Sequence, residues 1–217
     1  MTLIPDANIA AIIANATAIK GLCDQSISLL QPTGTFWNPA GVANNPMLSN
    51  GNLTAAATSP NGHVIPANRF FPPSGRIAEV HIDSDHNPGY TALAIIAASQ
   101  SISNPPVSLA AVPAGLWAWR DDGYAAHAGA SPSAPSFAQG DTIALFHNSD
   151  GKVYGIKNNL IIGDPVAGTG FLFQSVTGDP GGYTIALVFF GNAGSPVVTG
   201  NFVSLTTTLP AGAQLYQ

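Results

Sequence analysis

Side chains that could bind a metal ion are densest in the segment HIDSDHNPGY, residues 81–90, which contains His81, Asp83, Asp85 and His86. Because successive side chains of a strand point to opposite faces, His81 and Asp83 would share a face and could begin a divalent-cation site. Calcium loops usually carry more carboxylates at fixed spacing and close with a glutamate, which this segment lacks. We therefore interpret it as a strand that runs into an Asp-rich turn, and we expect no metal and no cofactor.

Paired carboxylates for acid–base chemistry are the second possibility. The single glutamate, Glu79, precedes Asp83 by four residues, so both would lie on one face of the same predicted strand, and Asp121 with Asp122 could oppose them. Glycosidases hold two carboxyl groups about 5 to 9.5 Å apart with separated pKa values, and nothing in the sequence requires that arrangement. A Gly-x-Ser-x-Gly motif and a phosphate-binding loop are also lacking. We predict that the protein is not an enzyme, and we assign no catalytic residue.

A cluster of aromatic and polar residues on one predicted strand and its turn is the best candidate for ligand binding: Trp117, Trp119, Arg120, Asp122, Tyr124 and His127. Strand alternation places Trp117 and Trp119 on one face and Arg120 on the other. If the tryptophans point inward, they are core residues. If they point outward, they form an aromatic platform that could stack a sugar ring or contact a protein partner. A third tryptophan, Trp37, is expected to be a buried anchor.

The composition limits which partners are possible. Only 8% of the 217 residues are charged, against roughly 25% in an average globular protein. Six basic residues, outnumbered by eleven acidic ones, cannot neutralise a phosphate backbone, which excludes nucleic acid as a partner. The longest apolar runs, 92–98 and 185–190, are too short for a membrane helix, and the amino terminus does not resemble a signal peptide. We expect a soluble chain whose nearly neutral surface packs against other subunits or binds neutral sugars.

Residues 6–31 are predicted to form the one substantial helix, capped by Asp6 and ended by Pro32 and Gly34. Its apolar side chains recur at three- and four-residue steps, the spacing of a coiled-coil seam. Such a helix could pack on its own domain or associate with other copies. We favour association into a homo-oligomer, and isoleucine at both seam positions favours a trimer over a dimer. The residues expected to mediate assembly or anchoring are Ile9, Ile12, Ile13, Ala16, Ile19, Cys23, Ile27 and Leu30.

The remainder of the chain has the pattern of an antiparallel β-sandwich. Short segments rich in β-branched and aromatic residues alternate with turns rich in Gly, Pro, Asn and Asp. We therefore divide the chain into a helical segment, 1–34, and a mainly β domain, 35–217. The predicted strands are residues 52–58, 76–83, 91–98, 115–120, 142–148, 152–157, 185–190 and 201–208.

One predicted hairpin resembles the hallmark of SPRY-like domains of the concanavalin-A-like lectin superfamily. Residues 140–159, GDTIALFHNSDGKVYGIKNN, contain the Gly-Asp start, the apolar strand, the Asp-Gly turn, the aromatic-bearing strand and Lys-Asn, with Asn159 where glycine is usual. Further pieces in matching order are 37–55, 74–83, 115–129 and 183–194, so that the resemblance covers about residues 36–205. The departures are Ile77 in place of an aromatic residue and a longer, Gly-rich segment at 161–182.

The resemblance implies a jelly-roll sandwich and a function. Some enzymes of the superfamily are glucanases, but their Glu-x-Asp-x-(x)-Glu strand is not matched here, and in SPRY-like domains a glutamate at the place of Glu79 usually belongs to the scaffold. The opening WNPAGVANNPMLSNGN, residues 37–52, is similar to SPRY-like modules in structural proteins of tailed bacteriophages. We thus expect a non-enzymatic virion protein made in the host cytoplasm, such as a capsid decoration, head fibre or tail fibre, with other virion proteins as partners. The alternative is an adhesin that binds host glycans.

Overall fold

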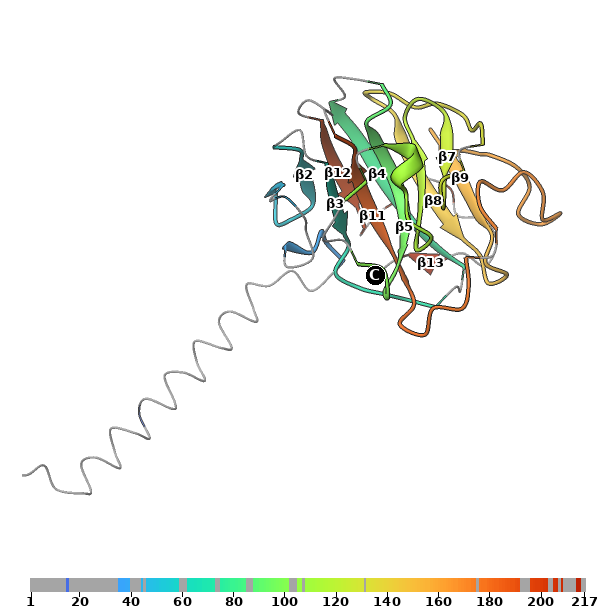
Figure 1. The fold of residues 1–217 in the computed structure, drawn as a ribbon, viewed down its shortest axis with the longest axis horizontal. Coiled ribbons are helices and arrows are strands. Elements are labelled where there is room, and N and C mark those ends of the chain that lie inside the picture. The colour runs from blue at the N-terminus through green and yellow to red at the C-terminus, as the bar shows by residue number, and fades with distance from the viewer. Residues whose placement is uncertain are drawn as a thin grey trace, which may run out of the picture. The chain divides into compact units, whose positions relative to one another are not determined.

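In a computed structural model of the protein, the described strands that follow residue 33 pair into two β-sheets (Figure 1). Apart from Asn15, the helix predicted over residues 6–31 lies outside the described residues, as do all eight of its assembly residues, so this part of the fold remains a prediction. The structure describes Asn15 and residues 35–39, 44, 46–58, 62–72, 75–84, 88–101, 105–106, 108–130, 132–174, 176–191, 196–202, 205–206, 208 and 214–215.

The larger sheet has eight strands, in the order β1-β2-β12-β4-β8-β9-β10, with β13 beside β4. All pairs are antiparallel except β13 with β4, which is parallel. Its strands are β1 (Met47–Ser49), β2 (Thr54–Ala56), β4 (Arg76–Ser84), β8 (Thr142–His147), β9 (Val153–Lys157), β10 (Leu160–Ile161), β12 (Val197–Asn201) and β13 (Gln214–Leu215).

The smaller sheet has five antiparallel strands in the order β3-β11-β5-β6-β7. They are β3 (His63–Pro66), β5 (Thr91–Ala97), β6 (Leu116–Arg120), β7 (Tyr124–Ala126) and β11 (Tyr183–Phe189). Five of the eight predicted strands closely match β4, β5, β6, β8 and β9, and the predicted 185–190 falls within one or two residues of β11.

The main hydrophobic core lies between the two sheets. It takes every second residue of the central strands, which is the period of a strand with one face inward. Trp37 is fully buried there, as expected, with its ring edge against Phe202 (centroids 4.9 Å apart) and its indole nitrogen donating to the Leu53 carbonyl at 2.8 Å. Gly200 makes room for both rings, because a Cβ at this position would lie 3.1 Å from the Trp37 ring and closer still to Phe202.

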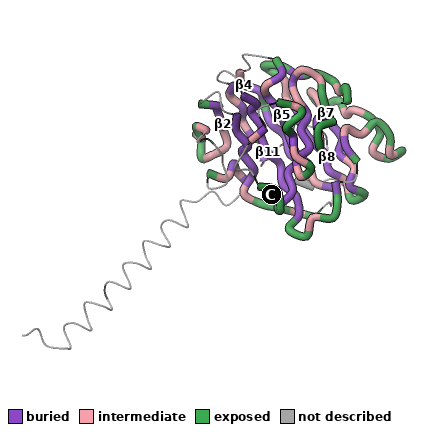
Figure 2. Tube along the Cα trace, in the orientation of Figure 1, coloured by how far each residue is buried: buried purple, intermediate pink, exposed green. Residues whose placement is uncertain are grey.

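The outer face of the smaller sheet is also covered, which explains why its central strands are buried throughout (Figure 2). Alanines dominate this face, and they form a second cluster with Val188 and Phe190. The connection from β5 to β6, which contains the short 3-10 helix η2 (Leu109–Ala111), crosses over them. Its Pro106 carbonyl faces Gly62 beside β3, and its Ala110 carbonyl faces Gly129 beyond β7. Small side chains on the sheet let this connection approach closely.

The hairpin of β8 and β9 has the predicted turn chemistry. The Asn148 side chain accepts hydrogen bonds from the backbone N–H groups of Asp150 (3.1 Å) and Lys152 (2.8 Å). Asn158 and Asn159 both have positive φ, 49° and 67°, and form a two-residue turn into β10. Asparagine tolerates this conformation better than other residues with a Cβ. This explains how Asn159 can stand where SPRY-like domains usually have glycine.

Two strand predictions require correction. Residues 201–208 were expected to form the last strand, but β12 ends at Asn201, and the described residues 205–206 are outside any strand. The predicted strand began at Asn201, whereas Gly200 already lies within β12, against the rings of Phe202 and Trp37. Residues 52–58 were expected to be one strand, but only Thr54–Ala56 pair, because Asn50, Gly51 and Asn52 form a turn of positive φ. Strands β1, β3, β7, β10 and β13 were not predicted; all are five residues or shorter, and most lie at sheet edges.

His147 at the end of β8 is a fully buried histidine. Its Nε2 donates to the Val176 carbonyl at 2.8 Å, its ring meets the edge of Tyr183, and its Nδ1 has no partner among the described residues. Burial lowers the pKa of His147 to about 4, although the bond to Val176 opposes this shift. The fold therefore holds the neutral imidazole.

This burial predicts a pH-dependent stability. The unfolded chain binds the proton at a higher pH than the folded chain, so the stabilisation is complete above the ordinary pKa and is lost as the pH falls from 6.5 towards 4. The loss should reach about 3 kcal/mol. Urea unfolding at a series of pH values measures it, and the His147→Gln variant should lose this part of the dependence. The exposed-site variant His81→Gln is the matched control, and an unchanged slope in His147→Gln would contradict the assignment.

Candidate functional site

Strand β6 divides the predicted ligand residues between two faces. Trp117 and Trp119 point into the core and Arg120 points away, as the alternation predicted. Trp119 is fully buried, donates its indole N–H to the Pro135 carbonyl at 2.7 Å and packs edge-on against Phe137. This side chain is a core residue and cannot serve as a surface platform.

Trp117 lies at the edge of the core, where it contacts His127, another of the predicted ligand residues. Its indole stacks on the imidazole of His127, with ring centroids 4.6 Å apart and planes 9° apart, and it meets the edge of Tyr183 at 5.9 Å. Nδ1 of His127 is 3.2 Å from the Leu116 carbonyl, a distance at which a protonated Nδ1 donates. Trp117 is 7% exposed, and its indole N–H is buried without a hydrogen-bond partner among the described residues. A buried donor that lacks an acceptor is uncommon in folded proteins.

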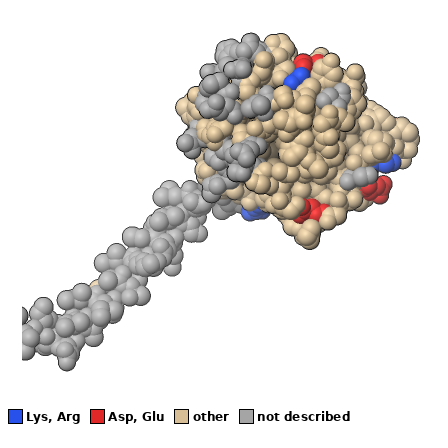
Figure 3. Space-filling view, viewed as in Figure 1, with Lys and Arg blue, Asp and Glu red and all other residues tan. Residues whose placement is uncertain are grey.

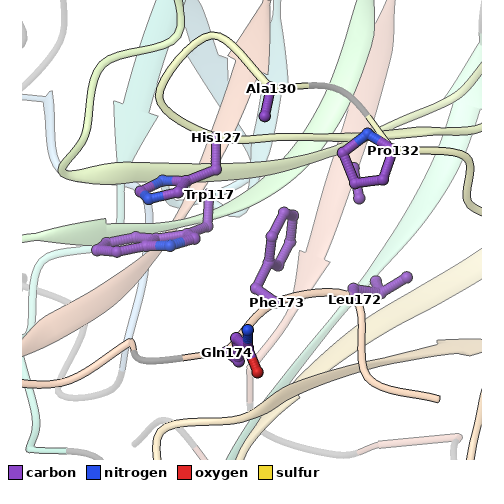
Figure 4. A pocket seen from close by; sticks show the side chains of 8 residues that line it. Trp117, His127, Ala130, Pro132, Leu172, Phe173 and Gln174 are labelled. Carbon is purple, nitrogen blue, oxygen red and sulfur yellow. The ribbon is translucent and has the colours of Figure 1, made fainter.

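This pair forms one wall of a cavity of about 180 Å³, which we call the rim cavity (Figure 4). It opens between the edges of the two sheets. Strands β6 and β7 form one side, and the segment 172–174, which hydrogen-bonds to Val153 of β9, forms the other. None of the described residues that line it carries a formal charge. They are Trp117, Ala125, His127, Ala130, Pro132, Leu172, Phe173 and Gln174.

Six lining residues of the rim cavity were not among the predicted ligand residues: Ala125, Ala130, Pro132, Leu172, Phe173 and Gln174. The last three belong to the Gly-rich segment that departs from the SPRY-like pattern. The signal that could have found them is the run Phe171-Leu172-Phe173, which is apolar within a glycine-rich connection. Strand pairing alone could not show that this run returns to β9 and faces β7.

The other three candidates form a separate cluster on the outer face of the smaller sheet. Arg120 donates from Nε to one oxygen of Asp122 at 2.7 Å and from a terminal nitrogen to the other. Its guanidinium also lies over the rings of Tyr124 (5.7 Å) and Phe190 (5.5 Å). The Arg120 charge is therefore neutralised within the domain, and this cluster does not share a site with Trp117 and His127. Charged side chains are sparse on the face of the sandwich shown in Figure 3.

Asp121 and Glu79, the buried carboxylates among the described residues, accept hydrogen bonds from the protein itself. Asp121 accepts hydrogen bonds from the backbone N–H groups of Gly89 (2.6 Å), Asp122 (2.8 Å) and Thr91 (3.2 Å), which ties the turn before β5 to the turn after β6. Glu79 of β4 accepts from the Asn201 side chain at 2.8 Å and from both the N–H and the hydroxyl of Thr206 at 3.0 Å. Glu79 and Asp121, which were considered as a pair for hydrolysis, thus belong to different sheets, and each accepts hydrogen bonds from a different set of donors.

The remaining acidic candidates also have structural contacts. Asp83 accepts from the Thr199 hydroxyl at 2.6 Å, and His81 pairs with Thr142 at 3.2 Å on the same outer face of the larger sheet. Asp85 and His86 lie outside the described residues. Within the described part of the chain, no group of three or more His, Cys, Asp or Glu side chains could hold a metal ion. There, too, no helix has the length and apolar character needed to cross a membrane.

At the start of β8, Asp141 closes the hairpin that carries the SPRY-like pattern. Its carboxylate accepts from the Ala138 N–H (2.8 Å) and the Asn158 amide (2.7 Å) and lies 2.9 Å from the Lys157 ammonium. Partial burial raises the pKa of Asp141, but the hydrogen bonds from Asn158 and Lys157 and the Lys157 charge outweigh this and leave it below its ordinary value. The contacts of Asp141 therefore stabilise the hairpin.

The structure is a SPRY-like β-sandwich. It has two β-sheets with a core between them, and Asp141 and Asn158 hydrogen-bond to each other across the β8–β9 hairpin. The structure is similar to the SPRY domain of human HERC1 at 16% identity and a TM-score of 0.60, over 78% of this chain and 99% of that one. A human SPRY domain matches at 15% identity and a TM-score of 0.57, over 76% and 99% of the two chains. The NEUZ (NHR) domain of Neuralized from Drosophila melanogaster matches at 11% identity and a TM-score of 0.51, over 77% and 91%.

At these identities the likeness establishes the fold alone. No protein-family profile matches the sequence, and no curated protein is significantly similar to it. The SPRY-like resemblance of the hairpin and its neighbouring segments is confirmed at the level of the fold.

The scaffold role of Asp121 can be tested by comparing the stability of a variant at this position with that of a variant at Asp122. Asp121→Asn should lower the free energy of unfolding by about 2 to 3 kcal/mol, because the amide turns a donor towards backbone N–H groups that are buried with it. Asp122→Asn, which weakens a partly exposed ion pair, should lower it by less than about 1 kcal/mol. Urea unfolding of both variants measures the difference, and equal losses would contradict the proposed role.

Proposed function

We propose that the protein is a non-enzymatic structural protein of a virus particle, in which the SPRY-like sandwich is displayed for recognition and the amino-terminal segment assembles copies. Capsid decoration, a head fibre and a tail-associated fibre are the roles this proposal includes. The observation that carries the recognition part is the rim cavity, an uncharged space whose wall includes the aromatic side chains of Trp117, His127 and Phe173. Pockets of this kind, apolar with a few polar groups, are the usual form of ligand sites.

The arrangement of titratable groups supports a role without catalysis. Asp121, Glu79 and Asp141 are each engaged by two or more donors from the scaffold. The rim cavity itself is lined by no described carboxylate, lysine or arginine. Among the described lining residues, His127 is the one titratable side chain, and none of the others is a nucleophile that it could activate.

The assembly part of the proposal rests on the sequence pattern of residues 6–31 and on the low charge of the chain. A chain in which only 8% of the residues are charged has a surface suited to close packing among subunits. Burying an isoleucine or leucine side chain contributes about 1.5 to 3 kcal/mol, so the six isoleucine and leucine positions among the predicted assembly residues could hold a homo-oligomer, with a trimer favoured by isoleucine at both seam positions. Other virion proteins are the further partners that this role implies.

Light scattering on the full chain tests the assembly part. Ile19→Asp should reduce the measured mass to that of a smaller species, because a carboxylate on the predicted seam opposes burial. Asn15→Asp adds the same charge at a polar position and should leave the mass unchanged. A full chain that is already monomeric, or an Ile19→Asp variant with the original mass, would remove the assembly argument.

Recognition of host glycans is the alternative function, and the neutral aromatic lining of the rim cavity favours it. An array of neutral and acidic glycans, probed with the full chain, should give a saturable signal that His127→Ala weakens at least tenfold. His81→Ala changes an exposed histidine away from the cavity and should have no effect. A silent array, or equal signals from both variants, would exclude glycan binding at this cavity.

A further inference from the structure

A loop beside the rim cavity carries an exposed apolar tip. Residues 162–171, which we call the tip loop, protrude from the sandwich next to β9 (Figure 1, orange). At its end lies Val166, which is 93% exposed, more than any other large hydrophobic side chain among the described residues. Leu160 on β10 follows at 74%. An isolated exposed valine is ordinary, but this one stands on a loop that is braced along its whole length.

The end of the tip loop is fixed by Asp164. Its carboxylate accepts hydrogen bonds from the backbone N–H groups of Val166 and Ala167, both at 2.9 Å. Asp164 and Thr169 also exchange two backbone hydrogen bonds, of 2.8 and 3.0 Å. The carboxylate is thus directed at its own loop, and the tip formed by Pro165 and Val166 offers an apolar surface.

The base of the tip loop is equally constrained. Gly163 and Gly170 lie in backbone contact, which only residues without a Cβ allow, and both have positive φ. The Lys152 ammonium donates to the Gly168 carbonyl at 3.0 Å and lies over the Phe171 ring at 5.5 Å. A loop held in this way presents its tip without loss of conformational entropy on binding, which favours association.

The rim cavity complements this tip in size and charge. Its volume of about 180 Å³ exceeds that of an apolar protein cavity of about 150 Å³ known to admit benzene, so it can take the side chains of Pro165 and Val166. Its described lining is uncharged, as is the tip. A charged or strongly hydrated group would lose more by desolvation here than it would regain.

The positions of tip and cavity suit a symmetric pair. Leu172 of the cavity wall follows Val166 by six residues, so the two lie at most about 20 Å apart on one chain. When a protrusion and a hollow lie side by side, a two-fold axis between them places each protrusion in the hollow of the other copy. Such isologous dimers are the commonest form of homo-oligomer.

We propose that the tip loop of one copy inserts Pro165 and Val166 into the rim cavity of a second copy of this chain, and the reverse. This proposal rests on the recognition role of the rim cavity and identifies its partner. It is independent of assembly by the amino-terminal segment, and the two contacts together would link oligomers into a larger array.

Disulfide cross-linking of the full chain tests the contact directly. In a Cys23→Ser background, Val166→Cys and Ala130→Cys place one thiol at the tip and one at the cavity. Mixed and exposed to oxidised glutathione, the two variants should form a mixed dimer at least tenfold faster than the control pair Leu160→Cys and Ala130→Cys. Equal rates for both pairs would overturn the proposal.

A second measurement separates two questions: whether the rim cavity binds a ligand, and whether that ligand is the tip loop of a second copy. A cyclic peptide with the sequence of residues 162–171, titrated into 15N-labelled full chain, should shift the indole N–H resonance of Trp117, and a peptide with Asp at the place of Val166 should bind at least tenfold more weakly. If the peptide leaves that resonance unmoved while a glycan from the array shifts it, the cavity recognises ligands but not this loop, and the second-copy proposal fails. If both the peptide titration and the cross-linking succeed, the partner is established.

Discussion

The packing of alternate side chains from β6 and β11 between the two sheets is the constraint on which the rest of the structure depends. Trp119, Tyr183 and Phe189 fill the space between the sheets, and each reaches it because its neighbours in sequence point the opposite way. At Trp117, which belongs to both, this core borders the rim cavity. The site is therefore a continuation of the core, built from the same residue types, and its lack of charge follows from that origin.

A chain with so few charges uses them for connections. Asp121 joins two turns, Glu79 holds the segment after β12, and Asp141 closes the β8–β9 hairpin. Asp121 accepts hydrogen bonds from the N–H groups of Gly89 and Thr91, which would otherwise be buried without this partner, and this is worth more to stability than an exposed ion pair. The described charged side chains thus serve mainly to join segments of the scaffold, as expected for a chain in which only 8% of residues are charged.

The same sandwich is formed by SPRY domains that share about one residue in six with this chain. In this chain, Asn159 has a positive φ in the turn between β9 and β10. The Gly-rich connection between β10 and β11 builds both the tip loop and one wall of the rim cavity, so both features arise from one stretch of sequence.

The sequence by itself determined the fold class, most central strands, the opposite faces of Trp117 and Arg120, and the turns around Asp150 and Asn158, because these depend on local periodicity and turn chemistry. It could not show which face of β6 points inward, since alternation is the same either way, and only the position of the second sheet decided that Trp119 is core. It also missed short edge strands and the return of residues 172–174 to β9, because pairing between distant segments leaves no local pattern. The joining of Trp117, His127 and Phe173 in one cavity is a product of tertiary structure alone.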